Sequence, residues 1–212
     1  MTLRIDTFVL GPLMTNCYVL RWDGQCWVVD PSLWPDDLLG FLHRTQVQPG
    51  RILLTHGHGD HIAGVADLKA AYPQARLGCP AGDAYMLGDP EANASAAFGV
   101  FLTCPPPDDL LQAGQCLQDG ALTWRILDTS GHTPGGVSFH CPDEQVVITG
   151  DALFQQGIGR TDIPGADERK LLRNIRDNLL SLPDDTRVLP GHGPQTTIGA
   201  ERRGNPFLQE RV

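Results

Sequence analysis

Residues 56–61 read His-Gly-His-Gly-Asp-His, which places three imidazoles and one carboxylate within six positions. The stretch lies between a short apolar run typical of a buried strand and a segment typical of a helix start. Neutral imidazole nitrogens and carboxylate oxygens are ligands that zinc, iron and manganese accept. Four such side chains on so short a loop would crowd a single ion, so the alternation predicts two. His56 and His58 point to one ion, and Asp60 and His61 to the other.

Three further metal-type ligands follow apolar runs in the same way. His132 comes after a glycine-containing turn, and Asp151 and His192 each come directly after a short apolar run that ends in glycine. Strands that end in tight turns bring side chains to one edge of a sheet, where active sites usually lie. Taken alone, His132 or His192 would more often be a structural turn residue than a metal ligand. Together with Asp151, they predict the rest of a metal site. The two remaining histidines, His43 and His140, fall in an expected helix and an expected strand, and we expect both to be structural.

The pattern H-x-H-x-D-H, followed at a distance by His, Asp and His, resembles the metallo-β-lactamase superfamily. The resemblance implies an α/β fold, the four-layer αββα sandwich, in one domain that spans residues 1–212. It also implies that Asp30 supports the site and that Asp151 bridges the two ions. The terminal ligands that it implies are His56, His58 and His132 for one ion, and Asp60, His61 and His192 for the other.

Within that superfamily, the chain is similar to the glyoxalase II (hydroxyacylglutathione hydrolase) group, in particular to its short single-domain bacterial members. This similarity implies hydrolysis of a thioester, S-lactoylglutathione or a related hydroxyacyl thioester, by a metal-bound hydroxide. It also implies two divalent metal ions, with zinc favoured over iron and manganese. Asp60 is the expected catalytic residue, which orients the hydroxide and carries its proton to the leaving group. The matching segments are 15–18, 55–64, 131–136, 150–154, 159–162, 190–194, 201–202 and 205–208.

Arg160 is the predicted substrate-binding residue. In the longer glyoxalase II enzymes, the loop after the bridging aspartate carries a basic residue that binds the glutathione carboxylate, and residues 159–162 place arginine there. Its guanidinium suits a bidentate carboxylate contact, although it can equally pair with Asp162 and shape the loop. Only twenty residues follow His192, so we expect the helical C-terminal domain of the longer enzymes, with its glutathione contacts, to be missing.

Four other interpretations of the motif stay open. A persulfide dioxygenase shares the 159–162 segment and would hold one iron with His56, His132 and Asp151, but its last motif is typically Ala-His-Asp-Tyr, which this chain lacks. A β-lactamase or lactonase, cleaving an amide or a lactone, fits the core motif but fits the flanking segments less well. A flavodiiron-type redox module typically has glutamate in place of His58. A purely structural site is closed and four-coordinate, whereas seven ligands for two ions leave positions for water and substrate.

Composition and charge narrow the range of partners. A net charge of −9 over 212 residues argues against nucleic acid, whose phosphates need a basic surface. No apolar signal core opens the chain and no run approaches membrane-spanning length, so we expect no membrane partner. The six cysteines form no C-x-x-C pair, which favours reduced thiols and a cytoplasmic protein. The expected partner is a small-molecule thioester, and the oligomeric state is left open.

The remaining pattern predicts short strands and a few amphipathic helices. Asp23-Gly24 predicts a hairpin turn between the second and third strands, and Asp167 is expected to cap the last predicted helix. Apolar residues at alternating or helical spacing place the other elements. The expected strands are 5–10, 17–22, 26–30, 52–54, 77–79, 115–117, 122–127, 136–140, 145–149 and 187–190, and the expected helices are 36–46, 62–72, 83–87 and 168–180.

Overall fold

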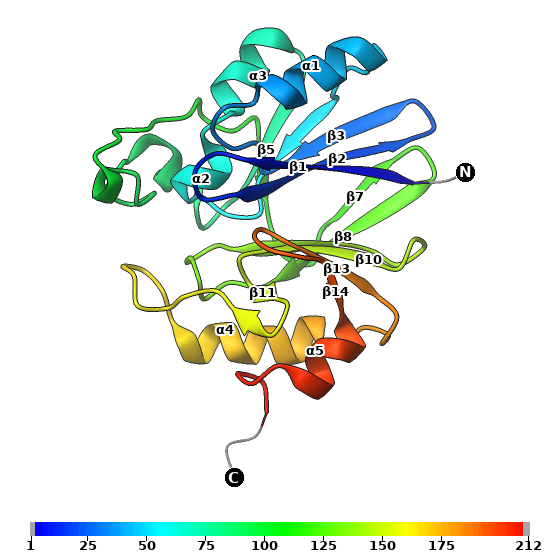
Figure 1. The fold of residues 1–212 in the computed structure, drawn as a ribbon, viewed down its shortest axis with the longest axis vertical. Helices are drawn as coiled ribbons and strands as arrows, with labels where there is room; N and C mark the ends of the chain where they lie inside the picture. The colour runs from blue at the N-terminus through cyan, green and yellow to red at the C-terminus, as the bar shows by residue number, and fades with distance from the viewer. Residues whose placement is uncertain (1–2, 210–212) are drawn as a thin grey trace. The chain divides into compact units, whose positions relative to one another are not determined.

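A computed structural model describes residues 3–209, which fall into two compact units. The first unit ends at Leu111 and the second begins at Gln112. Each unit has one six-stranded sheet with helices packed on it (Figure 1). The predicted α/β class is confirmed. The prediction of a single domain over residues 1–212 stays a prediction.

The sheet of the first unit begins with an antiparallel meander and continues with parallel strands. Its order is β1-β2-β3-β4-β5-β6. Asp23 and Gly24 both have positive φ, 42° and 80°, as a two-residue hairpin turn between β2 and β3 requires. The prediction of that turn is confirmed. The strands are β1 (Arg4–Leu10), β2 (Thr15–Trp22), β3 (Gln25–Val29), β4 (Arg51–Leu53), β5 (Arg76–Pro80) and β6 (Asp109–Leu111).

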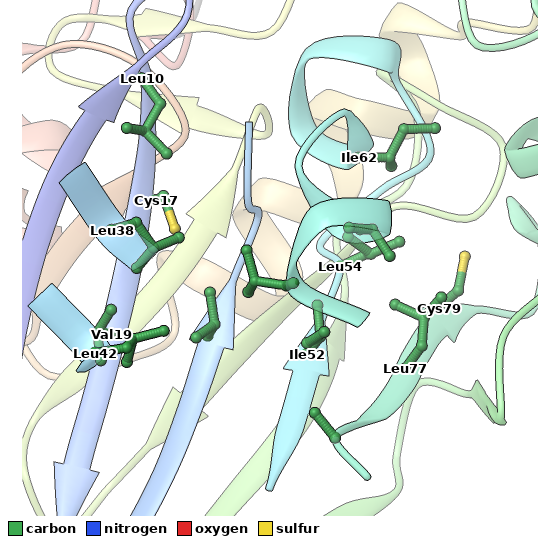
Figure 2. Packing of buried hydrophobic residues seen from close by; sticks show 14 of the residues in the cluster. Leu10, Cys17, Val19, Leu38, Leu42, Ile52, Leu54, Ile62, Leu77 and Cys79 are labelled. Carbon is green, nitrogen blue, oxygen red and sulfur yellow. The ribbon is translucent and has the colours of Figure 1, made fainter. Parts of the chain in front are cut away.

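Helices α1 (Asp36–Thr45) and α3 (Val65–Ala71) pack on one face of this sheet (Figure 1). Leu38 and Leu42 lie one helical turn apart on α1, so both face the sheet and are fully buried. Figure 2 shows them beside Cys17 and Val19 of β2, which belong to the same apolar cluster. This core includes Ile52 of β4, the strand that leads into the histidine motif at 56–61.

The helix expected over 62–72 is divided into two in the structure. A short helix, α2 (Gly59–Ile62), begins inside the histidine motif, and α3 follows only after Gly64. The amide of Gly64 donates to the carbonyl of Pro31 at 2.9 Å, and a Cβ at position 64 would collide with the carbonyl oxygen of Ser32. The loop after β3 therefore presses against this point and interrupts the helix. Two 3₁₀ turns, η1 (Ala84–Gly88) and η2 (Ala96–Phe98), lie between β5 and β6.

The second unit has a mostly antiparallel sheet in the order β14-β13-β10-β9-β8-β7. Only β10 and β13 run parallel, which brings the ends of both strands, Gly150 and Pro190, to the same edge. A small ribbon of two strands, β11 (Leu153–Phe154) and β12 (Gly157–Ile158), follows β10. The six strands are β7 (Cys116–Asp119), β8 (Leu122–Asp128), β9 (Val137–Cys141), β10 (Val146–Gly150), β13 (Arg187–Pro190) and β14 (Thr196–Thr197).

Helices α4 (Glu168–Asn174) and α5 (Ile198–Gly204) pack on the sheet of the second unit (Figure 1). The side chain of Asp167 accepts a hydrogen bond from the amide of Lys170 at 2.9 Å, so the predicted helix cap is confirmed. The helix continues past α4 as a π-helical turn, η3 (Ile175–Leu179). Leu171, Ile175 and Leu179 point into the core of this unit.

The state of the cysteines and the length of the helices bear on the expected location of the protein. All six cysteines are present as free thiols. No helix between residues 3 and 209 is both long and apolar enough to cross a membrane. The cytoplasmic location stays a prediction.

His140 gives the second unit a stability that depends on pH. It is buried on β9 and faces Arg125 across the β8–β9 ladder, and burial, followed by repulsion from Arg125, lowers the pKa of its imidazole. The folded state therefore binds this proton more weakly than the unfolded state, whose histidine pKa is about 6.5. The free energy of unfolding should fall as pH decreases below about 6.5, with a slope of at most about 1.4 kcal/mol per pH unit from this one proton.

Urea unfolding of the wild type and of His140→Gln at pH 5 to 8 checks this expectation. The variant lacks the titrating group, so the difference in unfolding free energy between the two proteins should shrink or reverse toward acid. A difference that is constant across this pH range would contradict it.

Candidate metal centre

The motif at 56–61 forms a buried cluster at the end of β4 in the first unit. His56, His58 and His61 are all at least nine-tenths buried, and the Asp60 side chain is more accessible. The ring centroids of His56 and His61 lie 4.1 Å apart, and those of His56 and His58 lie 4.9 Å apart. The structure therefore brings together the four side chains that the sequence singled out in this unit.

The hydrogen bonds around Asp30 fix the tautomer of two of these histidines. Asp30 is buried, and its Oδ2 lies 3.0 Å from Nδ1 of His61. A carboxylate only accepts, so the proton of His61 is on Nδ1. The same Oδ2 accepts the hydroxyl of Thr55 at 2.6 Å. Thr55 has only this one hydroxyl hydrogen, so its oxygen must accept from Nδ1 of His56, 3.0 Å away.

Both histidines therefore carry their proton on Nδ1 and direct the lone pair of Nε2 elsewhere. This is the usual arrangement of a metal-binding histidine, whose other nitrogen donates to a carboxylate or hydroxyl. The Nε2 of His61 lies 3.5 Å from Oδ2 of Asp60, which in turn accepts the hydroxyl of Thr15 at 3.0 Å. Two ligands of one tetrahedral zinc with bonds of 2.0–2.1 Å are about 3.3 Å apart. The donor set and its spacing therefore fit a divalent cation.

Asp30 itself suits a supporting role. One of its oxygens and the Nε2 or Nδ1 atoms of His56 and His61 all lie within 4.8 Å of one another, close enough to be considered as ligands. However, its carboxylate already accepts three hydrogen bonds, from the amide and hydroxyl of Thr55 and from His61. These bonds use the oxygens to orient the histidines, which agrees with the role that the resemblance implies.

The second unit places His132, Asp151 and His192 together. Nε2 of His132 lies 3.6 Å from Oδ2 of Asp151, and Nε2 of His192 lies 3.5 Å from the same oxygen. Nδ1 of His132 donates to the main-chain carbonyl of Arg160 at 2.8 Å, so this ring also directs its Nε2 lone pair toward the carboxylate. The spacing again matches that of ligands that share a cation.

Two glycines allow close packing of the segments around His132 in the second unit. A Cβ at Gly131, whose φ is 134°, would collide with the backbone of Leu171 in α4. A Cβ at Gly159 would collide with the carbonyl oxygen of Asp151 and lie 3.0 Å from the ring of His132. Gly131 therefore lets the segment before His132 pack against α4, and Gly159 lets the segment before Arg160 pack against Asp151 and His132.

A buried polar network that the sequence did not reveal holds the turn before His132. Asn174 donates to the carboxylate of Asp128 at 3.1 Å and to the carbonyl of Ser130 at 2.9 Å. The Asp128 carboxylate also accepts the Ser130 hydroxyl at 2.5 Å. The available sequence signal was an asparagine on the apolar side of a helix, three residues after the buried Leu171.

Arg160 forms an exposed ion pair in the structure. Its Nε and one terminal nitrogen donate to both carboxylate oxygens of Asp162, at 2.8 and 2.9 Å, while the two side chains remain 64% and 71% exposed. This pairing lowers the pKa of the Asp162 carboxyl. Exposed pairs of this kind add little stability, so the guanidinium can exchange this partner for another carboxylate. The loop-shaping contact that the sequence left open is therefore present.

The two histidines that were expected to be structural lie outside both clusters. His43 is exposed on α1, and His140 is on β9. Among the residues that the structure describes, neither belongs to a group of possible metal ligands.

Residues 10–192 match the family model of the metallo-beta-lactamase superfamily. The chain belongs to this superfamily, and it has the metallo-β-lactamase fold. The superfamily resemblance that the sequence suggested is confirmed.

Two curated relatives span nearly the full length of the chain. "Probable metallo-hydrolase YqgX" of Bacillus subtilis is 37% identical over 94% of both chains. "Hydroxyacylglutathione hydrolase GloC" of Haemophilus influenzae is 34% identical over 99% of this chain and 100% of the relative.

Two solved structures are similar over the same extent. The BLEG-1 B3 metallo-beta-lactamase superposes with a TM-score of 0.92 at 40% identity, covering 97% of this chain and 99% of that one. TTHA1623, solved in a di-iron-bound form, superposes with a TM-score of 0.87 at 38% identity, covering 96% and 100%. These similarities and the histidine clusters indicate a metallo-hydrolase that uses divalent metal.

Proposed function

We propose that this chain is a metal-dependent thioester hydrolase whose substrate is S-lactoylglutathione or a related hydroxyacyl thioester. The observation that carries the proposal is the protonation pattern of the buried histidines. His56, His61 and His132 each donate from Nδ1 to a protein acceptor, so each offers Nε2 as a metal ligand. The glyoxalase II-like specificity is supported by the segments that match that group and by the full-length relative named hydroxyacylglutathione hydrolase.

We propose one dinuclear centre built from the ligands of both units, which then act as a single catalytic domain. Zinc is the favoured metal because the ligands are nitrogen and oxygen atoms, and iron is the alternative because TTHA1623 was solved with two iron ions. Asp151 would bridge the ions, since its Oδ2 lies at ligand spacing from two histidines. The other ligands are His56, His58 and His132 for one ion, and Asp60, His61 and His192 for the other.

The ions and the chain have separate tasks in this chemistry. Bound divalent metal would lower the pKa of water to about 7 and polarise the carbonyl that is attacked. Asp60 orients the attacking water and accepts its proton, and Thr15 holds that carboxylate in place through its hydroxyl. A thiolate is a good leaving group and needs little acid assistance, so no additional acid is required.

A β-lactam is the second candidate substrate. The BLEG-1 B3 metallo-beta-lactamase is 40% identical to this chain, over 97% of its length. An amide has a poorer leaving group than a thioester and needs proton delivery to its nitrogen. Turnover of the two substrate classes by the same protein therefore separates the two functions.

Metal analysis of the purified protein, together with hydrolysis assays, tests the proposed function. We expect two metal ions per chain and turnover of S-lactoylglutathione that exceeds turnover of a β-lactam. A single iron with oxygen uptake on glutathione persulfide would show a dioxygenase instead. Faster turnover of the β-lactam would favour the second candidate.

We also propose that Arg160 binds a carboxylate of the substrate, and this makes a prediction. Arg160→Ala should raise KM about tenfold for a thioester whose thiol carries a carboxylate, as loss of one partly exposed charge-assisted contact implies. KM for a neutral thioester should change much less. The variant keeps the main-chain carbonyl that accepts from His132, so the ligand geometry is preserved.

Asp162→Ala is the matched control, because it breaks the same ion pair and leaves the guanidinium in place. If Arg160 binds the substrate carboxylate, the KM of this variant for the carboxylate-bearing thioester should stay the same or fall. Equal increases in both variants and with both substrates would show that the pair only shapes the loop.

A further inference from the structure

The segment between β5 and β6 contacts the histidine motif at two points that the ligand pattern does not include. We call residues 83–95 the cradle segment. The carboxylate Oδ2 of Asp83 accepts the amide of Gly57 at 3.1 Å. The main-chain carbonyl of Asn93 accepts the amide of Gly59 at 2.8 Å. These two glycines flank His58, so the cradle segment forms hydrogen bonds with the backbone immediately before and after that histidine.

The packing at these glycines is as close as the hydrogen bonds. A Cβ at position 57 would lie 2.9 Å from Cβ and 3.0 Å from Sδ of Met86. A Cβ at position 59 would lie 3.1 Å from Cβ of Ser95. Real side chains rarely tolerate such distances. The close approach of the cradle segment therefore explains why positions 57 and 59 require glycine. The backbone on both sides of His58 is therefore fixed by hydrogen bonds and by direct contact.

Asn93 also holds the cradle segment itself in shape. Its Nδ2 donates to the carbonyls of Met86 and Leu102, both at 3.0 Å, and its Oδ1 accepts the amide of Ser95 at 3.0 Å. Asn93 and Asp83 are both buried, with at most 1% of their surface exposed. Each buried polar group is thus committed to keeping one backbone arrangement, which makes its removal costly.

We propose that Asp83 and Asn93 are positioning residues that hold His58 for metal binding. This inference rests on the proposed dinuclear centre, in which His58 binds the ion shared with His56 and His132. A ligand on a short loop gains affinity when its backbone is held in the binding arrangement. Removal of a residue that orients a metal ligand typically lowers metal affinity 10- to 100-fold.

Zinc titration of the full-length apoprotein against a competing chelator tests the inference. Wild type is expected to bind two zinc ions. Asp83→Ala and Asn93→Ala should each weaken one of the two binding steps by about 10- to 100-fold, and leave the other nearly unchanged. Asp83→Asn keeps an oxygen that can accept from Gly57, so it should restore most of the lost affinity.

Asp108→Ala is the matched control. Its carboxylate also accepts a backbone amide in the first unit, that of Leu77 at 2.7 Å, but at the start of β5 and not beside the motif. Zinc binding by this variant should resemble wild type. Equal weakening of both steps in Asp83→Ala, or affinities like those of Asp108→Ala, would overturn the inference. If Asp83→Ala does not fold, Asn93→Ala decides by the same criterion, and a wild type without two zinc ions would refute the dinuclear centre instead.

Discussion

Replacing Asp151 with alanine is expected to lower turnover by about 10³-fold or more, because the proposed bridge contributes to both ions at once. Its Oδ2 lies 3.6 Å from Nε2 of His132 and 3.5 Å from Nε2 of His192. Removal of this carboxylate takes a negative charge from between two positions that are proposed to hold cations. We therefore expect Asp151→Ala to retain less than two metal ions per chain, and chelation of the wild type to abolish activity to a similar extent.

His43→Ala is the control for the loss of an arbitrary histidine. His43 is exposed near the end of α1, in the helix that covers the sheet of the first unit. Turnover and metal content of this variant should stay close to wild type. If His43→Ala proved as damaging as Asp151→Ala, the ligand assignment would be wrong. Metal content and turnover should be measured on the same preparations, so that misfolding is separated from loss of the bridge.

The ligand clusters could be located from the sequence because they follow apolar runs, and most of the ligands come directly after a glycine. Strand direction and chain reversal are local properties, so the ends of β4, β10 and β13 could be located without a structure. The same reasoning placed β2 and α1 within one or two residues of their observed bounds. Family resemblance then supplied the proposed assignment of all the ligands to two ions, which the local pattern gave only for residues 56–61.

The supporting residues could not be predicted because their partners are distant in the chain. Asp83 reaches Gly57 across 26 residues, and nothing in the local sequence distinguishes it from the N-cap of a short helix. Asn174 reaches the Asp128 carboxylate across 46 residues. Thr55 is a similar case. It orients His56 only because its hydroxyl hydrogen is donated to Asp30, which is 25 residues away.

The missed elements include α5, whose seven residues begin after a local Thr197 cap, and several very short strands. β11, β12 and β14 have two residues each, too few for any periodicity to appear. The division of the predicted helix at Gly64 follows from the carbonyl groups of the loop after β3 and not from helix propensity. A pattern of apolar residues cannot report either effect.

Asp60→Asn is expected to lower kcat by about 10²- to 10⁴-fold with little change in KM, because an amide cannot accept the proton of the attacking water. The carboxamide has nearly the same shape as the carboxylate, and its oxygen can still accept from the Thr15 hydroxyl, which lies 3.0 Å from Oδ2. Metal content separates the two roles proposed for Asp60. A variant that keeps two ions and loses kcat has lost the proton acceptor, whereas one that loses an ion has lost a ligand.

Thr15 tests the orientation of the same carboxylate without removing it. Thr15 is fully buried at the start of β2, so Thr15→Val keeps the shape of the side chain and removes only the hydroxyl that Asp60 accepts. A loss of about tenfold in kcat is expected, in line with a hydrogen bond to a charged group, and Thr15→Ser should recover most of it. Steady-state kinetics of the three variants on one thioester provide the measurement. If Thr15→Val and Asp60→Asn changed KM and left kcat intact, Asp60 would act in substrate binding and not on the attacking water.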